Sequence, residues 1–254
     1  MPETFQVTLS TPGGELAWPP PILHESIGST SIEAARLARE GAPHGTVVCA
    51  REQTAGRGRL GRRWVSPPGN LYASFVLRPA IPAMRAAEIG FVAALAVADV
   101  VDSFLPGRAQ LKWPNDVLVN GAKISGILAE RLGGEAAAVV LGIGINVAFA
   151  PGGLPYAATC LRSAGAAVTV EDTLAALCHA LRRRVAEWER DGFAAIRAGW
   201  LARAHPPGTV LRVSLGLGVV ECRFLGLDED GALLAEDEHG PRRIVSGDVA
   251  LAAA

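Results

Sequence analysis

The residues with the clearest chemical potential lie in segment 56–64, Gly-Arg-Gly-Arg-Leu-Gly-Arg-Arg-Trp, which we call the arginine loop. Glycines let backbone N–H groups approach an anion closely, and arginines form forked, charge-assisted hydrogen bonds with phosphate or carboxylate oxygens. The loop therefore indicates an anion-binding site. The alternatives are a solvated basic loop and an RNA-binding patch, but the chain has 24 basic against 25 acidic residues and lacks the basic excess typical of RNA-binding surfaces. No Lys-Ser or Lys-Thr follows the glycines at the spacing of a nucleotide P-loop.

A second polar group, residues 112–116 (Lys-Trp-Pro-Asn-Asp), combines a cation, an amide and a carboxylate just before an Asn120-Gly121 pair. Asn-Gly between two apolar runs predicts a two-residue hairpin turn. With that turn, Asp116 is expected opposite Ser125 and on the same face of the sheet as its diagonal neighbour Lys123. A carboxylate beside bound phosphates is suited to Mg2+, which makes Asp116 a candidate ligand; the alternative is a turn or capping role.

Hydrophobic periodicity predicts the elements that must position these groups. A capping box at residues 30–33 predicts a helix of about three turns, and a second box at residues 169–172 predicts a helix whose stripe from Leu174 to Trp188 is core. An Ala-rich run predicts a buried helix over residues 86–104. Strands are predicted over residues 46–50, 71–77 and 138–147 and on both sides of the Asn-Gly turn.

The sequence pattern changes beyond residues 205–208 (His-Pro-Pro-Gly), where short β-rich runs alternate with Gly and Asp-Gly turns. This pattern predicts a small β-barrel. At the other end, three prolines at 19–21 close an extended segment that is too short for a helix-turn-helix domain. We therefore expect an N-terminal extension over residues 1–21, a larger domain over residues 22–204 and a small β-barrel domain over residues 205–254.

Composition limits the classes of protein that fit. Half of the 254 residues are hydrophobic, which is typical of a globular core that needs no disulfides. The N-terminus lacks the features of a secretory signal, and no segment reaches the length of a membrane span. The balanced charge provides no global field that would hold the chain on nucleic acid or an anionic membrane. We interpret the cysteines as buried thiols of a cytoplasmic protein, because they are far apart and form no Cys-x-x-Cys pair: Cys49, Cys160, Cys178 and Cys222.

Taken in order, the arginine loop ending in Trp, the Lys-Trp-Pro-Asn-Asp string and a Lys before Gly-Ile-Leu resemble the signature motifs of the biotin protein ligase family. Ser29-Thr30 and residues 142–146 (Gly-Ile-Gly-Ile-Asn) also look like family motifs, so the resemblance covers the chain from about residue 22 to its end. Two positions depart from the pattern. Ser31 stands where the family often has Asn, and Ser125 where it often has Gly; both changes are to small residues.

The resemblance implies an α+β catalytic domain, with a mixed sheet of the α/β type flanked by helices, and a C-terminal SH3-like β-barrel. It implies an AMP-forming ligase that uses ATP with Mg2+ to convert biotin to biotinyl-5'-AMP and then joins biotin to a lysine of a biotin carboxyl carrier protein. Biotin and the ATP–Mg2+ complex would be substrates, with no tightly bound metal. The adenylate is itself the activated species, so no protein nucleophile is required. No nucleic-acid or membrane partner is implied, and monomer and homodimer both remain open.

The resemblance also implies roles for individual residues. Those for biotin are Ser29, Thr30, Gln53, Arg57, Gly58, Arg59 and Lys123. Those for ATP and the adenylate are Arg57, Arg59, Arg62, Trp64, Asn115, Lys123 and Asn146, with Trp64 stacked on adenine. Those for the reaction itself are Arg57, Arg59, Lys112, Asp116 and Lys123, because charge builds on oxygen in both steps. The simpler alternatives are a core role for Trp64 and a helix cap for Ser29 or Thr30.

Three other functions are weighed against this one. A lipoate or octanoate ligase shares the fold family and the adenylate chemistry, but the arginine loop and the Lys-Trp-Pro-Asn-Asp string favour biotin. A biotin-responsive repressor would need a further DNA-binding domain. A non-catalytic biotin-binding protein is disfavoured because all the charged motif positions are present. Because the loop arginines repel one another without an anion, we expect the loop to order when the adenylate forms.

Overall fold

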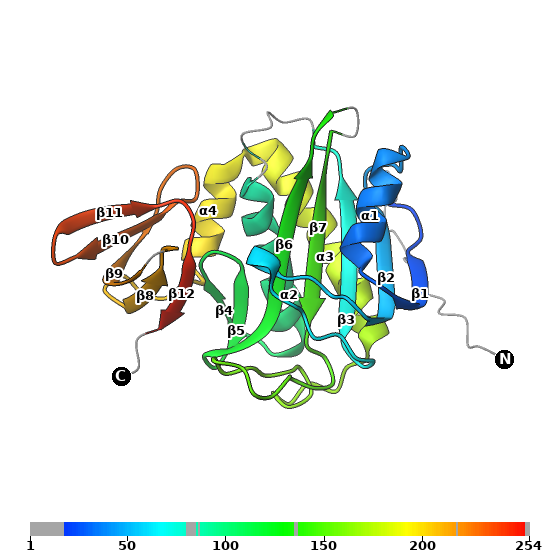
Figure 1. The fold of residues 1–254 in the computed structure, drawn as a ribbon, viewed down its shortest axis with the longest axis horizontal. Coiled ribbons are helices and arrows are strands. Elements are labelled where there is room, and N and C mark those ends of the chain that lie inside the picture. The colour runs from blue at the N-terminus through cyan, green and yellow to red at the C-terminus, as the bar shows by residue number, and fades with distance from the viewer. Residues whose placement is uncertain (1–17, 80–84, 86, 135–136, 217, 252–254) are drawn as a thin grey trace.

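The computed structural model describes residues 18–79, 85, 87–134, 137–216 and 218–251. Most of the N-terminal extension expected over residues 1–21 lies outside the described residues, as does residue 86, where the second helix was expected to begin. Figure 1 shows a large sheet with helices on both of its faces and a smaller sheet at the C-terminal end of the chain.

The large sheet has seven strands in the order β1-β2-β3-β7-β6-β5-β4. β1 pairs with β2 in parallel, and the other neighbouring strands are antiparallel, so the predicted mixed sheet is confirmed. The strands are β1 (Ile22–Ile27), β2 (Thr46–Gln53), β3 (Leu71–Leu77), β4 (Ala109–Lys112), β5 (Asp116–Val119), β6 (Ala122–Leu132) and β7 (Ala138–Ile145).

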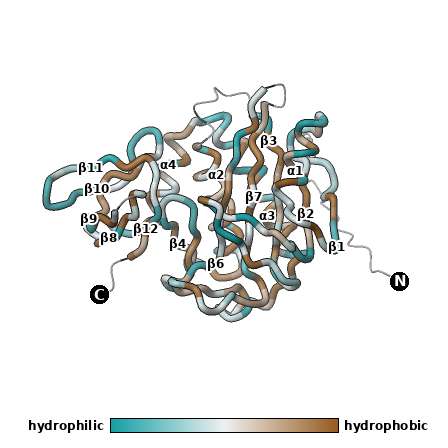
Figure 2. Tube along the Cα trace, in the orientation of Figure 1, coloured by the Kyte–Doolittle hydropathy of each residue, from teal (hydrophilic) through white to brown (hydrophobic). Residues whose placement is uncertain are grey.

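Helices cover the two faces of this sheet unequally. α1 (Thr30–Arg39) packs Ala34 and Ala38 on one face, whereas α2 (Glu88–Phe104), α3 (Val170–Asp191) and α4 (Phe193–Leu201) belong to the large core on the other. Side chains alternate along a strand, so Val47 faces the large core and Val48 faces α1. Figure 2 shows hydrophobic residues concentrated in the central strands and α2. One face of the sheet is thus only partly covered by α1.

The smaller sheet is antiparallel, with the order β11-β10-β9-β8-β12. Its strands are β8 (Val210–Ser214), β9 (Val219–Leu227), β10 (Leu233–Asp237), β11 (Gly240–Ile244) and β12 (Asp248–Leu251). The short strands predicted beyond residue 208 are confirmed, but β11 and β12 do not pair with each other in the described part of the chain, so the barrel is open. Phe224 and Leu233 join the large core, and the indole N–H of Trp113 donates to the carbonyl of Gly231 at 3.1 Å.

Of the two predicted capping boxes, one forms and the other does not. At α3 the box forms: Thr169 accepts from the backbone N–H of Asp172 at 3.0 Å, and the Asp172 carboxylate accepts from the backbone N–H of Thr169 at 3.1 Å. At α1 the prediction is wrong. The N-cap is Ser29, which makes no side-chain capping bond, and the hydroxyl of Thr30 contacts Gln53 in β2 and Ser74 in β3 instead of capping the helix. The helix itself is present with its predicted length.

Five elements were not predicted from the sequence, namely β1, β4, α4, β12 and a short 3-10 helix, η1 (Arg59–Gly61). β1 and β4 are short and only partly buried, so neither shows a clean alternation of apolar and polar residues. The expectation of buried thiols is confirmed, since Cys49, Cys160, Cys178 and Cys222 are free and buried. No helix in the described ranges is both long and apolar enough to cross a membrane.

Candidate active site

A cavity of about 490 Å3 opens on the face of the large sheet that α1 leaves uncovered. The arginine loop crosses in front of β6 and β7 at this place, as Figure 1 shows in cyan, and β12 of the smaller sheet supplies another wall. The predicted site residues that line the cavity are Thr30, Gln53, Arg57, Gly58, Arg59, Arg62, Trp64, Lys112, Asn115, Asp116 and Lys123. Ser29 and Asn146 are not among the lining residues.

Asp116 lies between two lysines at the cavity wall. The Nζ of Lys123 is 2.6 Å from one carboxylate oxygen, and the Nζ of Lys112 is 2.8 Å from the other. Burial alone would favour the protonated carboxyl, but the two ammonium groups outweigh burial and lower the pKa of Asp116. Lys112 also donates to the carbonyl of Val249 at 2.6 Å. Both cations are therefore held in defined positions beside the cavity.

The hairpin that carries these groups differs from its predicted register by one residue. The Asn120-Gly121 turn is present, with φ of 51° and 75°, and Leu118 faces Lys123 as expected. Asp116, however, faces Gly126 rather than Ser125, because a register shift between Val117 and Leu118 leaves one extra residue on β6. The predicted contact between Asp116 and Lys123 still forms, because their side chains span the offset.

The donor set at Asp116 does not fit a protein-bound Mg2+. Both of its oxygens already accept from lysine ammonium groups, and a positive pair repels a cation. In the described part of the chain, no group of three or more His, Cys, Asp or Glu side chains could hold a metal ion. The role that the sequence suggested for Asp116 as a magnesium ligand therefore finds no support in the geometry.

The arginine loop closes on itself through backbone hydrogen bonds. Trp64 N–H donates to the carbonyl of Gly56 at 3.0 Å, and Gly58 N–H donates to that of Arg62 at 2.7 Å. A Cβ on Gly56 would lie 2.4 Å from the Trp64 carbonyl oxygen, so the loop requires glycine there. At the tip, Leu60 has a φ of 55° and is 74% exposed.

Three of the loop arginines have carboxylate partners within the protein. Arg57 makes a forked contact with Glu130, at 2.8 and 3.2 Å. Arg59 donates to the side-chain oxygen of Asn115 at 3.1 Å, and both Arg59 and Arg62 contact Asp248. The repulsion expected among the arginines is therefore relieved within the protein, by residues that sequence reasoning did not select.

Trp64 lies flat against the sheet because two glycines leave room for it. A Cβ on Gly144 would lie 2.5 Å from the indole Nε1, and one on Gly126 would lie 2.8 Å from the six-membered ring. These glycines are partners across β6 and β7. The Nζ of Lys123 is 5.6 Å from the ring centroid. The indole N–H is buried and has no partner among the described residues, which leaves a donor beside the cavity.

A network of hydroxyls and an amide lies where α1 meets β2 and β3. Thr30 donates to the side-chain oxygen of Gln53 from both its backbone N–H, at 2.9 Å, and its hydroxyl, at 3.0 Å. Gln53 in turn donates to Ser66 at 3.0 Å, and the hydroxyls of Thr30 and Ser74 are 2.8 Å apart. This part of the cavity offers donors and acceptors to a polar ring. The hydroxyl of Ser29 is buried and unpartnered among the described residues, but it lies outside the lining.

The two asparagines predicted to support the nucleotide are placed differently. Asn115 lines the cavity, where it donates to the carbonyl of Ile127 at 2.7 Å and orients Arg59. Asn146 instead fixes the segment after β7, since its amide donates to the carbonyl of Thr159 at 3.0 Å. Sequence reasoning also missed Tyr156, which lines the cavity with its ring centroid 5.3 Å from the Nζ of Lys123. Tyr156 belongs to no motif that could have signalled it.

Cations gathered around a cavity of this size, with a glycine floor and a tryptophan, define a site for an anionic ligand of nucleotide size. Comparisons with known proteins agree. Residues 24–146 match the model of the biotin/lipoate A/B protein ligase family, and residues 212–251 match the biotin protein ligase C terminal domain. The chain belongs to the biotin protein ligase family.

Individual relatives cover most of the chain. The biotin–[acetyl-CoA-carboxylase] ligase of Paracoccus denitrificans is 42% identical over 231 residues, which span 87% of this chain and 96% of that protein. The bifunctional ligase/repressor BirA of Bacillus subtilis is 35% identical over 238 residues, which span 91% of this chain and 73% of that protein. A solved structure, the Aquifex aeolicus biotin protein ligase in complex with biotin and ATP, superposes with a TM-score of 0.79 at 30% identity, covering 92% of this chain and 99% of that one.

Proposed function

We propose that this chain activates biotin with ATP to form biotinyl-5'-AMP and then transfers biotin to a lysine of a biotin carboxyl carrier protein. The observation that carries the proposal is the convergence of the arginine loop and the Lys112–Asp116–Lys123 cluster on one cavity. A relative named for acetyl-CoA carboxylase, 42% identical, supports a carboxylase subunit as the acceptor.

In the first step a carboxylate oxygen of biotin attacks the α-phosphorus of ATP, a new P–O bond forms, and pyrophosphate leaves. Charge builds on the phosphoryl oxygens, and we assign its stabilisation to Arg57, Arg59 and Lys123. These cations line the cavity, and their present partners are carboxylates of the protein. Ligand oxygens would share these cations with the carboxylates, and cations held in place before the reaction stabilise developing charge strongly.

The biotin ring fits the polar network at α1. Its ureido group has two N–H donors and one carbonyl acceptor, and Thr30 and Gln53 offer hydroxyl and amide groups that can complement them. We assign adenine to Trp64, whose ring lines the cavity above Gly126 and Gly144. Asn146 does not line the cavity, and we assign it to the support of the segment that contains Thr159; Ser29 also lies outside the lining, at the start of α1.

In the second step the carrier's lysine amine attacks the carbonyl carbon of the mixed anhydride. An amide bond forms, the bond between that carbon and the phosphate oxygen breaks, AMP leaves with the negative charge, and the attacking amine releases one proton to solvent. Lys112 and Lys123 are positioned to stabilise that charge. Mg2+ would enter with the phosphates of ATP, because the described part of the chain has no group of carboxylates that could hold it.

The division into a catalytic domain over residues 22–204 and a small domain over residues 205–254 is part of this proposal. The separate family matches over residues 24–146 and 212–251 support it. We also propose that the enzyme acts in the cytoplasm, where its four buried thiols would stay reduced.

The test is exchange of labelled pyrophosphate into ATP by the purified protein with Mg2+, in the presence of biotin, lipoate or octanoate. Exchange with biotin alone is expected. Exchange with lipoate or octanoate would instead assign the chain to the other ligases of the family. If none of the three acids supports exchange while labelled biotin still binds, the protein is a biotin-binding protein without adenylating activity.

A further inference from the structure

Asp248 begins strand β12 in the smaller sheet, yet its carboxylate faces the arginine loop of the larger body. Arg62 donates a hydrogen bond to one carboxylate oxygen, and an Nη of Arg59 lies 3.9 Å from the other. Arg59 also reaches the carbonyl of Gly247 at 3.5 Å. One acidic residue, 186 positions along the chain from Arg62, therefore contacts two of the loop's arginines.

The strand that presents this carboxylate is firmly held. Asp248 is paired with Ser214 in β8, and a Cβ on Gly247 would lie 3.1 Å from the carbonyl oxygen of Ser214. The next residue, Val249, accepts the hydrogen bond from Lys112. The arginine loop, by contrast, contains only one short 3-10 turn, Arg59–Gly61, and pairs with no strand of either sheet. A strand fixed in a sheet thus contacts a loop with little regular structure of its own.

We propose that Asp248 is a positioning residue whose contacts with Arg59 and Arg62 hold the arginine loop closed over the cavity. The inference rests on the proposed function. Without Asp248, repulsion between the two arginines would favour open loop conformations that cannot bind ATP. The apparent affinity of a ligand falls in proportion to the fraction of protein in the binding-competent state, whereas saturating ligand restores that state. Through Asp248, the smaller sheet therefore influences the KM for ATP of the site on the large sheet.

The contact between Arg57 and Glu130 cannot replace this one. Glu130 lies in β6, so that pair joins the loop to the sheet beneath it. Asp248 acts on the other side, from across the cavity, and its side chain is 26% exposed against 24% for Arg59. Partial burial limits screening by salt, so the charge of Asp248 acts on Arg59 at ordinary ionic strength.

Kinetics of pyrophosphate exchange test the proposal with three variants. Asp248→Asn removes the charge at constant size and is expected to raise the KM for ATP about tenfold while kcat stays within about twofold. Asp248→Glu, which keeps the charge, is expected to recover most of the loss. Asp228→Asn is the matched control, because it breaks an arginine contact, with Arg243, in the same sheet but away from the cavity. An unchanged KM in Asp248→Asn, or a fall in kcat alone, would overturn the proposal.

Limited trypsin digestion tests the same contact without catalysis. In the absence of ligand, cleavage after the loop arginines is expected to be about tenfold faster in Asp248→Asn than in the wild type or Asp228→Asn. Equal cleavage rates would show that Asp248 does not hold the arginine loop closed. If the wild type shows no biotin-dependent exchange, the proposed function fails while this digestion still decides the role of Asp248.

A double-variant comparison separates positioning from direct contact with ATP. If Arg62 acts through Asp248, Arg62→Gln should raise the KM for ATP as Asp248→Asn does, and the double variant should be no worse than either. If the effects of the two substitutions on the KM multiply, Arg62 binds ATP independently of Asp248. Asp248 then does not act by holding Arg62 in place.

Discussion

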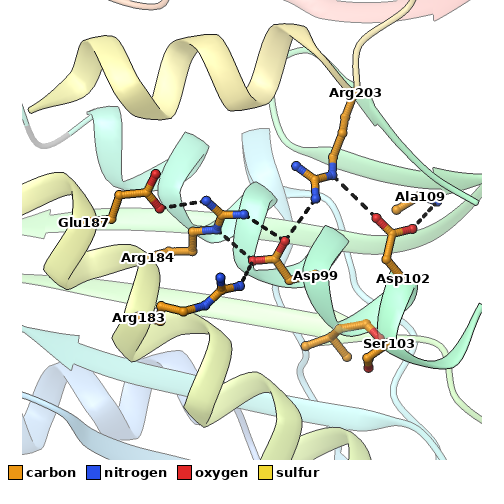
Figure 3. Close-up of polar contacts among 9 residues, drawn as sticks. Asp99, Asp102, Ser103, Ala109, Arg183, Arg184, Glu187 and Arg203 are labelled. Carbon is orange, nitrogen blue, oxygen red and sulfur yellow. Dashed lines mark hydrogen bonds and ion pairs between the residues drawn. The ribbon is translucent and has the colours of Figure 1, made fainter. Parts of the chain in front are cut away.

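Asp99 and Asp116 each bind more than one cation, on opposite sides of the large sheet. Asp99 lies on α2 and accepts from Arg184 at 2.7 and 2.9 Å, from Arg183 at 2.6 Å and from Arg203 at 3.1 Å (Figure 3). Asp116 accepts from Lys112 and Lys123 at similar distances. Each cluster thus gathers several cations around one carboxylate that is 11% exposed.

They differ in what surrounds them. The Asp99 cluster joins α2 to α3 and to the segment after α4, and its arginines have further carboxylate partners, Glu187 and Asp102. The Asp116 cluster borders the cavity, where a ligand can replace the carboxylate as the partner of the lysines. A charge cluster therefore indicates function only where space for a ligand adjoins it; elsewhere it fastens elements together.

The largest effect is expected on catalysis, from a substitution of Lys123 in the Asp116 cluster. Lys123→Gln removes a cation from the cavity and should lower kcat/KM for pyrophosphate exchange about 10²- to 10³-fold. The fold should tolerate the change, since Asp116 keeps Lys112. The measurement is exchange kinetics alongside urea unfolding. A variant that loses stability rather than activity would place Lys123 in the same structural class as the Asp99 arginines.

The reverse outcome is expected at Asp99. Asp99→Asn leaves the partly buried Arg184 without its forked partner and should lower the free energy of unfolding by about 2–3 kcal/mol. Because the cluster is remote from the cavity lining, kcat/KM at a temperature where the variant is folded should stay within about twofold of the wild type. A loss of activity without loss of stability would show that the two sides of the sheet are coupled.

A third contrast concerns glycines on the two sides. In Gly144→Ala the new Cβ would overlap the indole of Trp64, so the ring must move and exchange activity should fall about 10- to 100-fold. Gly90→Ala in α2 has open space around the new Cβ and should stabilise the protein by about 0.5–1 kcal/mol without affecting exchange. The chain has five tryptophans, so the difference in fluorescence between each variant and the same variant carrying Trp64→Phe would report whether the ring of Trp64 has moved. Unchanged activity in Gly144→Ala would exclude Trp64 from the site.

Local patterns predicted much of this fold. The strand over residues 71–77 has the predicted bounds, the Thr169 capping box forms, and the stripe on α3 is buried core. Each depends on neighbours within a few positions in the sequence. β1 was missed because its half-exposed residues show no clean alternation. At Thr30, contacts with Gln53 and Ser74 overrode a local capping signal.

The site was predictable to the extent that its groups are close in sequence. A hairpin of known turn type brought Asp116 to Lys123, even though the register was off by one residue. Asp248 and Glu130 were not predictable in the same way. Their arginine partners lie 186 and 73 positions away, and no spacing rule connects such distant segments. The carboxylates that contact the loop arginines are therefore visible only in the folded chain.

The smallest effect should be seen in acid, again at Asp116. The folded state lowers the pKa of this carboxyl because the ammonium groups of Lys112 and Lys123 outweigh its burial. A lowered pKa means that the ionised form contributes stability above the pKa of the unfolded chain, about 4, and that the contribution is lost as pH falls further. Asp116→Asn has no such group to protonate. Between pH 7 and pH 3, its free energy of unfolding should therefore fall less than that of the wild type, as urea titrations at each pH would measure. Parallel curves of unfolding free energy against pH would mean that the two lysines do not lower the pKa of Asp116 in the folded protein.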